Sequence, residues 1–427
     1  MTSILVEPVS HPLAATVVVP GSKSIANRAL VCAALADGTS RLMGVPDGDD
    51  TAALVDCLSR LGVGVLLEGD EAEVRGCGGE LTRGPVTLMC RLAGTTSRFV
   101  TAVAVLGPGP YLIDGDGPLR SRPMAPLHGA LAALGASVES LGEPGHLPVM
   151  IAGVRQRGTT GGRQSVRVAG DISSQYITAL MLIGPYLDTG LRIELATELV
   201  SRPYVDMTRA VMAAFGCADV EIGHRTIEIA PGRYVGCEYP VEPDASSASY
   251  PLAAAAIVGG RVRVDGLGSV SHQGDTRFAD VLAEMGCDVE RAPTWTEVRR
   301  TGPLTGIEVD MADISDCAPT LAVVAATATS PTRVTGVGFI RAKESDRIGD
   351  VVRELRRCGI DAEAETDGFI VRPGGLRGAH VMTYHDHRIA MSFALLGLVM
   401  PGMVIDDPAV VSKSFPGFWR LLSSLKN

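Results

Sequence analysis

Six apolar segments with almost no charge recur along the chain, and each of them predicts a buried helix. A surface helix keeps one polar face, whereas most of these segments carry no charge beyond their first turn. Each segment is followed by a turn and a short run that predicts a strand. The predicted helices cover residues 27–36, 97–106, 175–187, 247–258, 318–328 and 387–400, and the predicted strands cover residues 41–45, 111–114, 191–195, 261–265, 332–335 and 403–406.

A second recurring unit is a predicted helix that ends at a glycine, with a strand directly after it. Glycine readily takes the left-handed conformation that ends helices. The glycines are Gly62, Gly135, Gly216, Gly286 and Gly359, spaced 73, 81, 70 and 73 residues apart. Such regular spacing indicates an internal repeat. The sixth helix, residues 415–425, lacks a following strand, so residues 3–7 at the other end are the candidate for it.

This pattern predicts an α/β protein of six repeated strand-helix-strand-helix units with buried helices, three units in each of two lobes. If the N-terminal strand completes the sixth unit, residues 1–20 and 241–427 form lobe one and residues 21–240 form lobe two. The chain then crosses twice between the lobes, near residues 20–21 and 239–243. We expect the active site in a cleft between the lobes that opens and closes.

Composition narrows the class of protein. An apolar content of 46% with 20% charge is typical of a globular protein with large cores. The longest apolar stretches are too short to span a bilayer, and residues 1–12 do not follow the pattern of a signal peptide. Nine scattered cysteines without a metal-ligand spacing indicate reduced thiols of a cytoplasmic protein. A net charge of −10 argues against a nucleic acid or an acidic membrane as partner.

A small polar loop opens each of the six apolar helices, and cations gather at these loops or at nearby turns. The start of a helix offers unpaired N–H groups and a partial positive charge, so it favours phosphate or carboxylate. The alternative is that these residues are ordinary helix caps and solvated cations. The occurrence of six such loops in register argues against this alternative. The loops are residues 21–24, 92–95, 171–175, 244–247, 315–319 and 385–388, and the cations are Lys23, Arg28, Arg98, Arg122, Lys343, Arg347, Arg388 and Lys413. The pattern predicts a site for small, multiply charged anions.

Metals and nucleotides fit the chain less well. His385 and His387 could suggest a metal ion, but no third ligand accompanies them. Neither a phosphate-binding P-loop nor a glycine-rich dinucleotide motif is present, which disfavours ATP and NAD.

Taken together, these segments resemble the signature segments of the EPSP synthase family, the 3-phosphoshikimate 1-carboxyvinyltransferases. The resemblance covers essentially the whole chain in order, and residues 20–24 and 343–347 are its most specific parts. The similar segments are residues 20–24 with 27–30, 92–95 with Arg98, 122–123, 173–175, 201–204, 243–248, 343–347, 386–388 and Lys413.

The resemblance implies a fold, a reaction and a set of partners. The fold would be a two-lobed inside-out α/β barrel. The reaction would transfer the enolpyruvyl group of phosphoenolpyruvate to the 5-hydroxyl of shikimate 3-phosphate, releasing phosphate, in aromatic amino-acid biosynthesis. The expected partners are these two anionic substrates, with no nucleic acid and no membrane. A cytoplasmic monomer without a metal or an organic cofactor is expected.

The resemblance also implies roles for individual residues. The addition of an alcohol to the donor requires a base and an acid. Asp316 would take the hydroxyl proton and Glu344 would serve the C3 carbon, with Lys23 as an alternative or additional proton carrier. Phosphoenolpyruvate would be held by Lys23, Gly94, Arg122, Gln175, Arg347, Arg388 and Lys413. Shikimate 3-phosphate would be held by Lys23, Ser24, Arg28, Ser173, Ser174, Gln175, Ser201, Tyr204, Asp316 and Lys343, with Thr95, Arg98 and His387 in support.

Three departures keep other readings open. Leu92, Phe339 and His385 stand where asparagine is frequent in the family, and each could remove a hydrogen bond to substrate. One alternative is therefore an enolpyruvyl transferase for another hydroxylated acid. A UDP-N-acetylglucosamine enolpyruvyl transferase would carry a cysteine on a mobile loop, but residues 116–126 contain none. A non-catalytic anion-binding relative would not need Asp316, Glu344 and Lys23.

Overall fold

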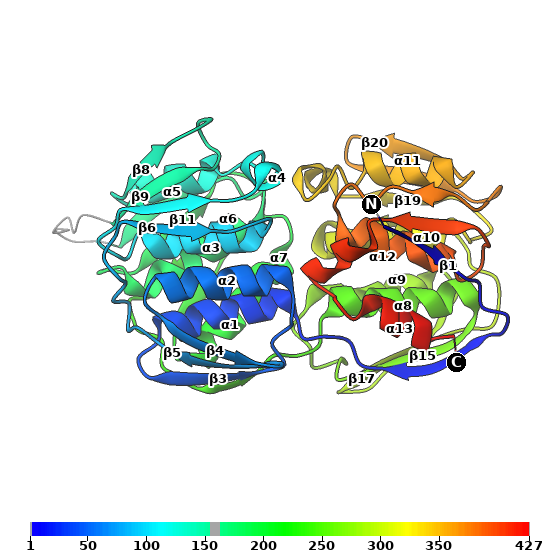
Figure 1. The fold of residues 1–427 in the computed structure, drawn as a ribbon, viewed down its shortest axis with the longest axis horizontal. Helices are drawn as coiled ribbons and strands as arrows, with labels where there is room; N and C mark the ends of the chain where they lie inside the picture. The colour runs from blue at the N-terminus through cyan, green and yellow to red at the C-terminus, as the bar shows by residue number, and fades with distance from the viewer. Residues whose placement is uncertain (1, 154–162, 427) are drawn as a thin grey trace. The chain divides into compact units, whose positions relative to one another are not determined.

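The computed structural model describes residues 2–153 and 163–426, and the chain divides into two compact units (Figure 1). Unit 1 comprises Met1–Pro20 and Glu242–Asn427, and unit 2 comprises Gly21–Val241. Each unit mixes helices with strands and has its own hydrophobic core. Met1 and Asn427, the outer limits of the predicted lobe one, lie outside the described residues.

The described strands of unit 2 form three four-stranded sheets with the same order. In each sheet the first two strands are parallel, and the third and fourth each run antiparallel to the strand before. Their orders are β14-β3-β5-β4, β6-β7-β9-β8 and β10-β11-β13-β12. The bounds are β3 Thr39–Met43, β4 Gly64–Glu68, β5 Glu71–Arg75, β6 Val86–Met89, β7 Tyr111–Asp114, β8 Ser137–Ser140, β9 Val149–Ala152, β10 Gln164–Val168, β11 Leu191–Leu195, β12 Val220–Ile222, β13 Thr226–Ile229 and β14 Glu238–Pro240.

Unit 1 repeats this order in two sheets, and its third sheet has three strands. The four-stranded sheets run β2-β15-β17-β16 and β18-β19-β21-β20, and the third runs β22-β23-β1. None of the described sheets closes into a barrel. The bounds are β1 Ser3–Val6, β2 Leu13–Val17, β15 Gly260–Asp265, β16 Asp288–Arg291, β17 Trp295–Arg300, β18 Glu308–Asp310, β19 Thr332–Thr335, β20 Asp361–Glu365, β21 Gly368–Arg372, β22 His380–Val381 and β23 Met403–Asp406.

The three-stranded sheet joins the N-terminal strand β1 to the last strand of the described chain, β23. Strand β1 pairs antiparallel with β23, with Ser3 opposite Asp406 and Val6 opposite Met403. In the other five sheets the strand directly after the glycine stop takes the fourth place, and β1 takes the third place of its sheet. The N-terminal segment thus adds a strand to the sheet of the sixth unit, as the sequence analysis expected, but the fourth place of that sheet holds no described strand.

The six apolar segments form six buried helices, as the pattern of charge predicted. Ten successive residues of the first helix, from Ala26 on, are no more than 2% exposed. The helices are α1 Lys23–Leu35, α3 Gly94–Ala104, α6 Ser174–Ile183, α8 Ala245–Val258, α10 Ala318–Ala325 and α12 His387–Leu396. The remaining helices are α2 Asp49–Arg60, α4 Gly117–Arg120, α5 Ala125–Ala133, α7 Arg202–Ala214, α9 Phe278–Glu284, α11 Gly349–Arg357 and α13 Phe418–Ser424, with 3-10 turns η1 Gly184–Tyr186, η2 Gly274–Arg277, η3 Ala312–Cys317, η4 Gly338–Ala342 and η5 Pro408–Lys413.

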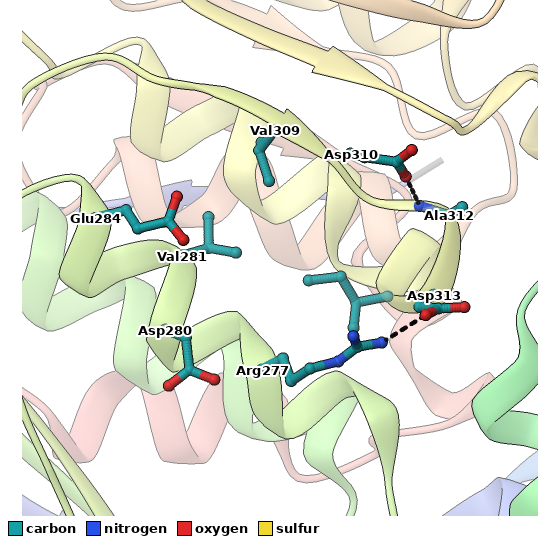
Figure 2. Close-up of a pocket in the computed structure, with 9 residues that line it drawn as sticks. Arg277, Asp280, Val281, Glu284, Val309, Asp310, Ala312 and Asp313 are labelled. Atoms are coloured by element: carbon teal, nitrogen blue, oxygen red, sulfur yellow. Dashed lines mark hydrogen bonds and ion pairs between the residues drawn. The ribbon is translucent and has the colours of Figure 1, made fainter.

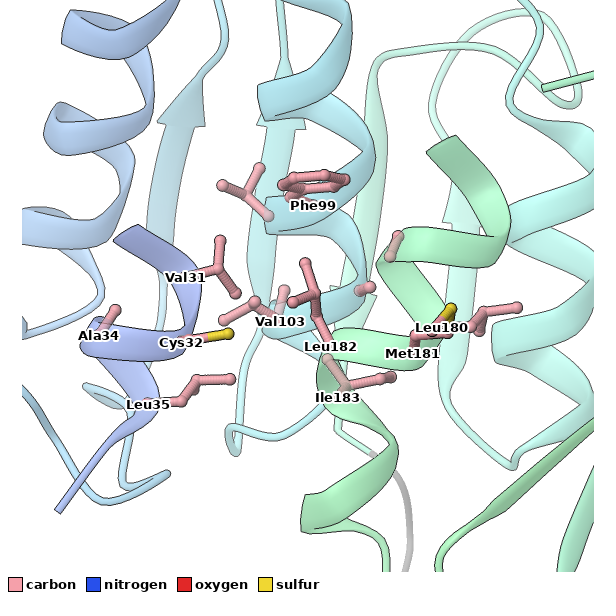
Figure 3. Close-up of a cluster of buried hydrophobic side chains, with 14 of the residues drawn as sticks. Val31, Cys32, Ala34, Leu35, Phe99, Val103, Leu180, Met181, Leu182 and Ile183 are labelled. Carbon is pink, nitrogen blue, oxygen red and sulfur yellow. The ribbon is translucent and has the colours of Figure 1, made fainter. Parts of the chain in front are cut away.

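Helices α1, α3 and α6 supply much of the core of unit 2 (Figure 3). Val31 and Cys32 of α1, Phe99 and Val103 of α3, and Leu182 of α6 lie in one cluster, and all five are at most 1% exposed. Burying such side chains contributes roughly 1.5–3 kcal/mol for each large one. This packing fixes the three helices relative to one another. It therefore also fixes the positions of the polar loops from which they begin.

The five glycines at the predicted helix stops all have a positive φ. The values are 96° at Gly62, 98° at Gly135, 91° at Gly216, 106° at Gly286 and 85° at Gly359. This is the region that glycine enters without a steric penalty. The prediction that each glycine ends a helix in the left-handed conformation is confirmed.

No helix in residues 2–153 or 163–426 is long and apolar enough to cross a membrane.

Candidate functional site

In unit 1, the starts of helices α8, α10 and α12 are tied together by hydroxyl groups. Ser249 of α8 lies 3.3 Å from Thr320 of α10, and Thr320 lies 3.3 Å from Ser392 of α12, oxygen to oxygen. All three side chains are buried. Since hydrogen bonds in such an interior are rarely left unmade, they fix the three helices relative to one another. The loops before α10 and α12 therefore carry their charged residues to one place.

Asp316, just before α10, receives three cations. Its Oδ2 accepts from Nη2 of Arg388 at 2.7 Å, and its Oδ1 accepts from Nη1 of Arg347 at 2.9 Å. The ammonium group of Lys343 lies 3.7 Å from the same Oδ1. Burial by itself raises the pKa of Asp316, but Arg388, Lys343 and Arg347 together hold it well below its usual value. Without substrate, Asp316 is therefore a stable anion and a weak base.

Arg347 is the most enclosed cation of this group, with 1% of its surface exposed. Its guanidinium donates to Asp386 through Nε at 2.7 Å and through Nη2 at 3.2 Å, and also from Nη2 to Glu344 at 2.8 Å. Burial lowers the pKa of Arg347, but the carboxylates of Asp386, Glu344 and Asp316 more than offset it, so the pKa is raised. These carboxylates therefore fix the orientation of the Arg347 guanidinium.

Glu344 links a further cation to the same network. Its Oε1 lies 3.8 Å from the ammonium group of Lys413, whose side chain is 8% exposed. Lys343, one residue earlier, is drawn toward Asp316, and burial lowers its pKa. Six predicted site residues of unit 1, Asp316, Lys343, Glu344, Arg347, Arg388 and Lys413, are thus brought together with Asp386. We call these seven residues the charge network.

In unit 2, the polar loop before α1 places Lys23 against an acidic residue. Ser22 caps the helix, because its hydroxyl accepts from the backbone N–H of Ile25. The ammonium group of Lys23 then lies 3.0 Å from Oδ2 of Asp50 at the start of α2. The carboxylate of Asp50 is almost completely buried. This pair fixes Lys23 at the place where helices α1 and α2 begin.

Arg28 is held by neutral oxygens of three helices. It donates to Thr208 of α7 at 2.8 Å, to Thr178 of α6 at 3.2 Å, and to the backbone oxygen of Ser24 at 2.6 Å. The rings of Phe99 and Tyr204 lie 5.7 and 5.8 Å from its guanidinium carbon. Burial lowers the pKa of Arg28 to about 10. The group therefore remains a cation at neutral pH, in surroundings that strengthen its attraction for an anion.

Gly94 begins α3 with two guanidinium groups beside it. A Cβ at this position would lie 2.5 Å from Nη1 of Arg122 and 3.0 Å from Nη1 of Arg98. Arg98 donates to the backbone oxygens of Gly94 and Pro123, at 3.0 and 3.1 Å, and so ties the two loops together. The side chain of Gln175 donates to Thr95 at 3.2 Å, which joins the starts of α6 and α3. The loops of α3 and α6 and the turn of Arg122 are thus brought together.

The remaining predicted residues of unit 2 lie at the starts of α6 and α7. Ser173 caps α6 by accepting from the N–H of Gln175 at 3.2 Å, and Ser174 follows, 8% exposed. Ser201 precedes α7 with a left-handed φ of 54°. The backbone oxygen of Tyr204 accepts from Arg28 at 3.3 Å. Of these residues, Tyr204 is the one that contacts Arg28 directly.

The two histidines before and at the start of α12 do not converge. His387 is 1% exposed, with Nδ1 3.8 Å from Asp386, whereas the side chain of His385 is 71% exposed and lies 3.6 Å from Asp407. Within residues 2–153 and 163–426, no group of three or more His, Cys, Asp or Glu side chains is arranged to hold a metal ion.

The other two departures from the family pattern also have visible surroundings. The ring of Phe339 lies 5.9 Å from the ammonium group of Lys343, a cation–π contact that an asparagine would not make. Leu92, in the loop 92–95 two residues before Gly94, is 36% exposed. Phe339 thus steadies the cation beside Asp316 instead of donating a hydrogen bond.

A pocket of about 430 Å³ elsewhere in unit 1 contains none of the predicted site residues (Figure 2). It lies between the helical segment 277–284 and residues 309–314, and Asp280, Glu284, Asp310 and Asp313 line it. Its one basic residue, Arg277, is paired with Asp313 at 3.0 Å. Such an acidic lining repels anions, so this pocket does not fit the chemistry that the loops predict.

The start of α8 is filled by carboxyl groups of the protein itself. Asp244 caps the helix, accepting from the N–H of Ser247 at 2.6 Å, and Ser246 donates its hydroxyl proton to the buried Asp275. Gln273 bonds to the backbone on both sides of Asp244. The carboxylate of Asp244 thus occupies this helix start and offsets part of the positive potential that would attract an external anion to residues 244–247.

Asp275 should make stability depend on pH, and Asp275→Asn should remove that dependence. Burial raises the pKa of Asp275 to about 7, and the nearby Asp316 acts in the same direction. The folded protein therefore keeps a proton that the unfolded chain releases near pH 4, so stability falls as the pH rises from about 4 through 7. The gain in melting temperature of the variant over the original should grow between pH 5 and pH 8. Asp280→Asn, on the exposed side of α9, is the matched control, and an equal gain at both pH values would contradict the assignment.

Several important residues escaped the sequence analysis. Asp386 lies in a quoted segment but received no role, and Asp50, Asp275 and Glu354 were not singled out. Asp50 stands in a run of acidic residues before a helix, which gives no sign of its partner. Asp386, one residue before an apolar helix, carried the signal of a cap, and it caps α12 by accepting from the N–H of Arg388.

Comparisons with known proteins agree on one family. The family model of EPSP synthase (3-phosphoshikimate 1-carboxyvinyltransferase) matches residues 8–422. The 3-phosphoshikimate 1-carboxyvinyltransferases of Nostoc punctiforme and Methanoculleus marisnigri are 42% and 43% identical to this chain, over 98% and 96% of both chains. A solved structure of EPSP synthase from Acinetobacter baumannii has a TM-score of 0.81 and 27% identity, covering 99% of this chain and 97% of that one. The chain belongs to the EPSP synthase family.

Proposed function

We propose that this protein transfers the enolpyruvyl group of phosphoenolpyruvate to the 5-hydroxyl of shikimate 3-phosphate. The hydroxyl oxygen adds to C2 of the donor while C3 gains a proton. The tetrahedral intermediate then loses phosphate and a proton from C3, which restores the double bond. The products are 5-enolpyruvylshikimate 3-phosphate and phosphate, and the reaction serves aromatic amino-acid biosynthesis. Membership of the family over nearly the whole chain supports this proposal.

The charge network is the observation that carries the proposal. It gathers four cations, Lys343, Arg347, Arg388 and Lys413, around the carboxylates that the reaction needs, Asp316 and Glu344. Cations in such number suit substrates with several negative charges, and they stabilise the phosphate as it leaves.

Substrate anions would also make Asp316 a better base. Its pKa is held low by Arg388, Lys343 and Arg347. When phosphate and carboxylate groups bind to these cations, their pull on Asp316 weakens and its pKa rises toward a useful value. Asp316 would then take the hydroxyl proton, while Glu344 serves C3 and Lys23 acts as an alternative or additional carrier. The binding of the substrates would thus itself activate Asp316 as a base.

The two substrates divide the remaining groups. We assign the phosphoenolpyruvate anion to Lys23, Gly94, Arg122, Gln175, Arg347, Arg388 and Lys413. We assign shikimate 3-phosphate to Lys23, Ser24, Arg28, Ser173, Ser174, Gln175, Ser201, Tyr204, Asp316 and Lys343. Among these, Arg28 suits a carboxylate or phosphate because its present partners are neutral oxygens.

The proposal extends to the architecture and the setting of the enzyme. The six sheets with their buried helices would be the units of a two-lobed inside-out α/β barrel, with residues 1–20 and 241–427 in one lobe and residues 21–240 in the other. The common strand order of five sheets supports equivalent units. The enzyme would be a cytoplasmic monomer that uses no metal and no organic cofactor.

Phosphate release from phosphoenolpyruvate by the purified protein tests the function. Release should depend on shikimate 3-phosphate, and UDP-N-acetylglucosamine should not replace it. Other hydroxylated acids form a third arm, because release with one of them alone would identify another acceptor. Absence of release with every acceptor would overturn the proposal and leave an anion-binding protein.

A further inference from the structure

The backbone directly before Arg388 is held in an unusual conformation. Tyr384 and His385 have φ values of 53° and 57°, so two successive residues with side chains are left-handed. This conformation costs roughly 1–2 kcal/mol for each such residue. Asp386 and Arg388 follow directly and belong to the charge network. Strain of this kind persists only where surrounding contacts enforce it.

A buried carboxylate of helix α11 supplies those contacts. Glu354 is 0% exposed, its Oε1 accepts from the hydroxyl of Tyr384 at 2.6 Å, and its Oε2 accepts from the N–H of Met382 at 3.0 Å. Arg357 lies 3.4 Å from the same Oε2. Both carboxylate oxygens are thus used to hold one short segment of backbone.

Helix α11 holds the ring of Tyr384 as well as its hydroxyl. The guanidinium carbon of Arg353, one residue before Glu354, lies 5.5 Å from the centre of the ring. Arg353 is itself paired with Asp350. The side chain of Tyr384 is therefore fixed at two points by a single helix, and its backbone is restricted accordingly.

The same helix begins next to the other cationic loop. Helix α11 starts at Gly349, two residues after Arg347. Arg347 and Ser345 of that loop donate to Asp386, at 2.7 and 3.0 Å, and Asp386 accepts from the N–H of Arg388 at 2.9 Å. Asp386 is completely buried. Helix α11 thus connects the loop of Arg347 to the segment of Arg388 through Glu354 and Tyr384.

We propose that Glu354 and Tyr384 are positioning residues that aim the guanidinium groups of Arg388 and Arg347 at the enolpyruvyl donor. Neither residue belongs to the charge network, and both act on it through the backbone before Asp386. The inference rests on the proposed function, since it concerns the binding of that donor. Guanidinium groups bind carboxylate and phosphate through directional hydrogen bonds, so a small displacement of both groups weakens the binding of the donor.

Tyr384→Phe removes only the hydroxyl group and keeps the ring against Arg353. It leaves an oxygen of the buried Glu354 carboxylate unpaired and releases the segment before Asp386. The KM for phosphoenolpyruvate should rise roughly tenfold, as expected for the loss of a hydrogen bond to a charged group, while kcat changes less. The KM for shikimate 3-phosphate should change least, because most of the groups assigned to it lie elsewhere in the chain.

Tyr111→Phe is the matched control. Tyr111 is buried, whereas Tyr384 is half-buried, and the hydroxyl of Tyr111 donates to the backbone oxygen of Thr82 at 2.6 Å, far in the sequence from every residue of the charge network. Both variants should lose thermal stability, but only Tyr384→Phe should raise the KM. If Tyr384→Phe matches the control in both measurements, the role is merely structural and the proposal is overturned.

Glu354→Gln provides a second test if Tyr384→Phe folds poorly. It keeps the size of the side chain and an acceptor for Tyr384, but it turns an amide N–H₂ toward the N–H of Met382. The KM for phosphoenolpyruvate should again rise, and an unchanged KM in this variant would equally overturn the proposal. If neither the original protein nor any variant releases phosphate, the result contradicts the proposed function instead.

Discussion

Asp316→Asn should lower kcat by a factor of roughly 10² to 10⁴, the range typical of losing a general base. The asparagine keeps the shape of the side chain, but its single oxygen can accept from only one of Arg388 and Arg347, which donate to the two oxygens of Asp316 at 2.7 and 2.9 Å. It cannot take the proton of the attacking hydroxyl. The measurement is phosphate release at saturating concentrations of both substrates.

Asp313→Asn is the natural control for this variant. Asp313 lies three residues earlier in the same 3-10 turn, but its side chain is 44% exposed and pairs with Arg277. Its kcat should stay within about twofold, since exposed ion pairs contribute little. If Asp316→Asn instead raised only the KM for shikimate 3-phosphate and kept kcat, Asp316 would bind the acceptor without serving as the base.

Asp386→Ala should have the largest effect on stability of any single change in the charge network. It removes two of the hydrogen bonds of Arg347, which is 1% exposed, along with the cap of α12. Breaking a buried ion pair from one side costs about 3–5 kcal/mol, because the remaining charge stays buried without its partner. In a unit of this size, the melting temperature should fall by on the order of 10 °C.

The comparison for this experiment is an exposed ion pair of the same unit. Glu308 lies 3.0 Å from Arg333, and both side chains are well exposed. Glu308→Ala should therefore change the free energy of unfolding by no more than about 1 kcal/mol. A fall in melting temperature for Asp386→Ala as small as that for Glu308→Ala would show that Arg347 finds other partners.

Much of the fold could be predicted because its signals are local. Charge-free segments gave the six buried helices, and α8, predicted at residues 247–258, runs Ala245–Val258. The glycines gave the helix stops, since a left-handed φ depends on the residue itself. The sequence also indicated roughly where each helix begins. It did not give the exact first residue, because a polar cap such as Ser22 is part of neither the apolar segment nor the strand before it.

The partners of the charged groups could not be predicted in the same way. The sequence analysis assigned Arg347 and Arg388 to a substrate, whereas the structure pairs both with carboxylates of the protein. Which residues meet depends on how the helices pack, and a residue type alone does not report that. The left-handed pair Tyr384 and His385 was equally hidden. Both residues carry side chains for which this conformation is costly, so only the contacts of the folded chain reveal it.

The pairing of β1 with β23 has a consequence for the order in which the protein can be made. Strands β1 and β2 leave the ribosome first, but their partners β15 and β23 follow only at residues 260–264 and 403–406. Residues 21–241 form a continuous unit with its own core, so they can fold during translation, as N-terminal domains generally do. The first twenty residues must meanwhile wait as unpaired strands. The synthesis of unit 1 therefore begins before that of unit 2, but unit 1 can complete its fold only after unit 2.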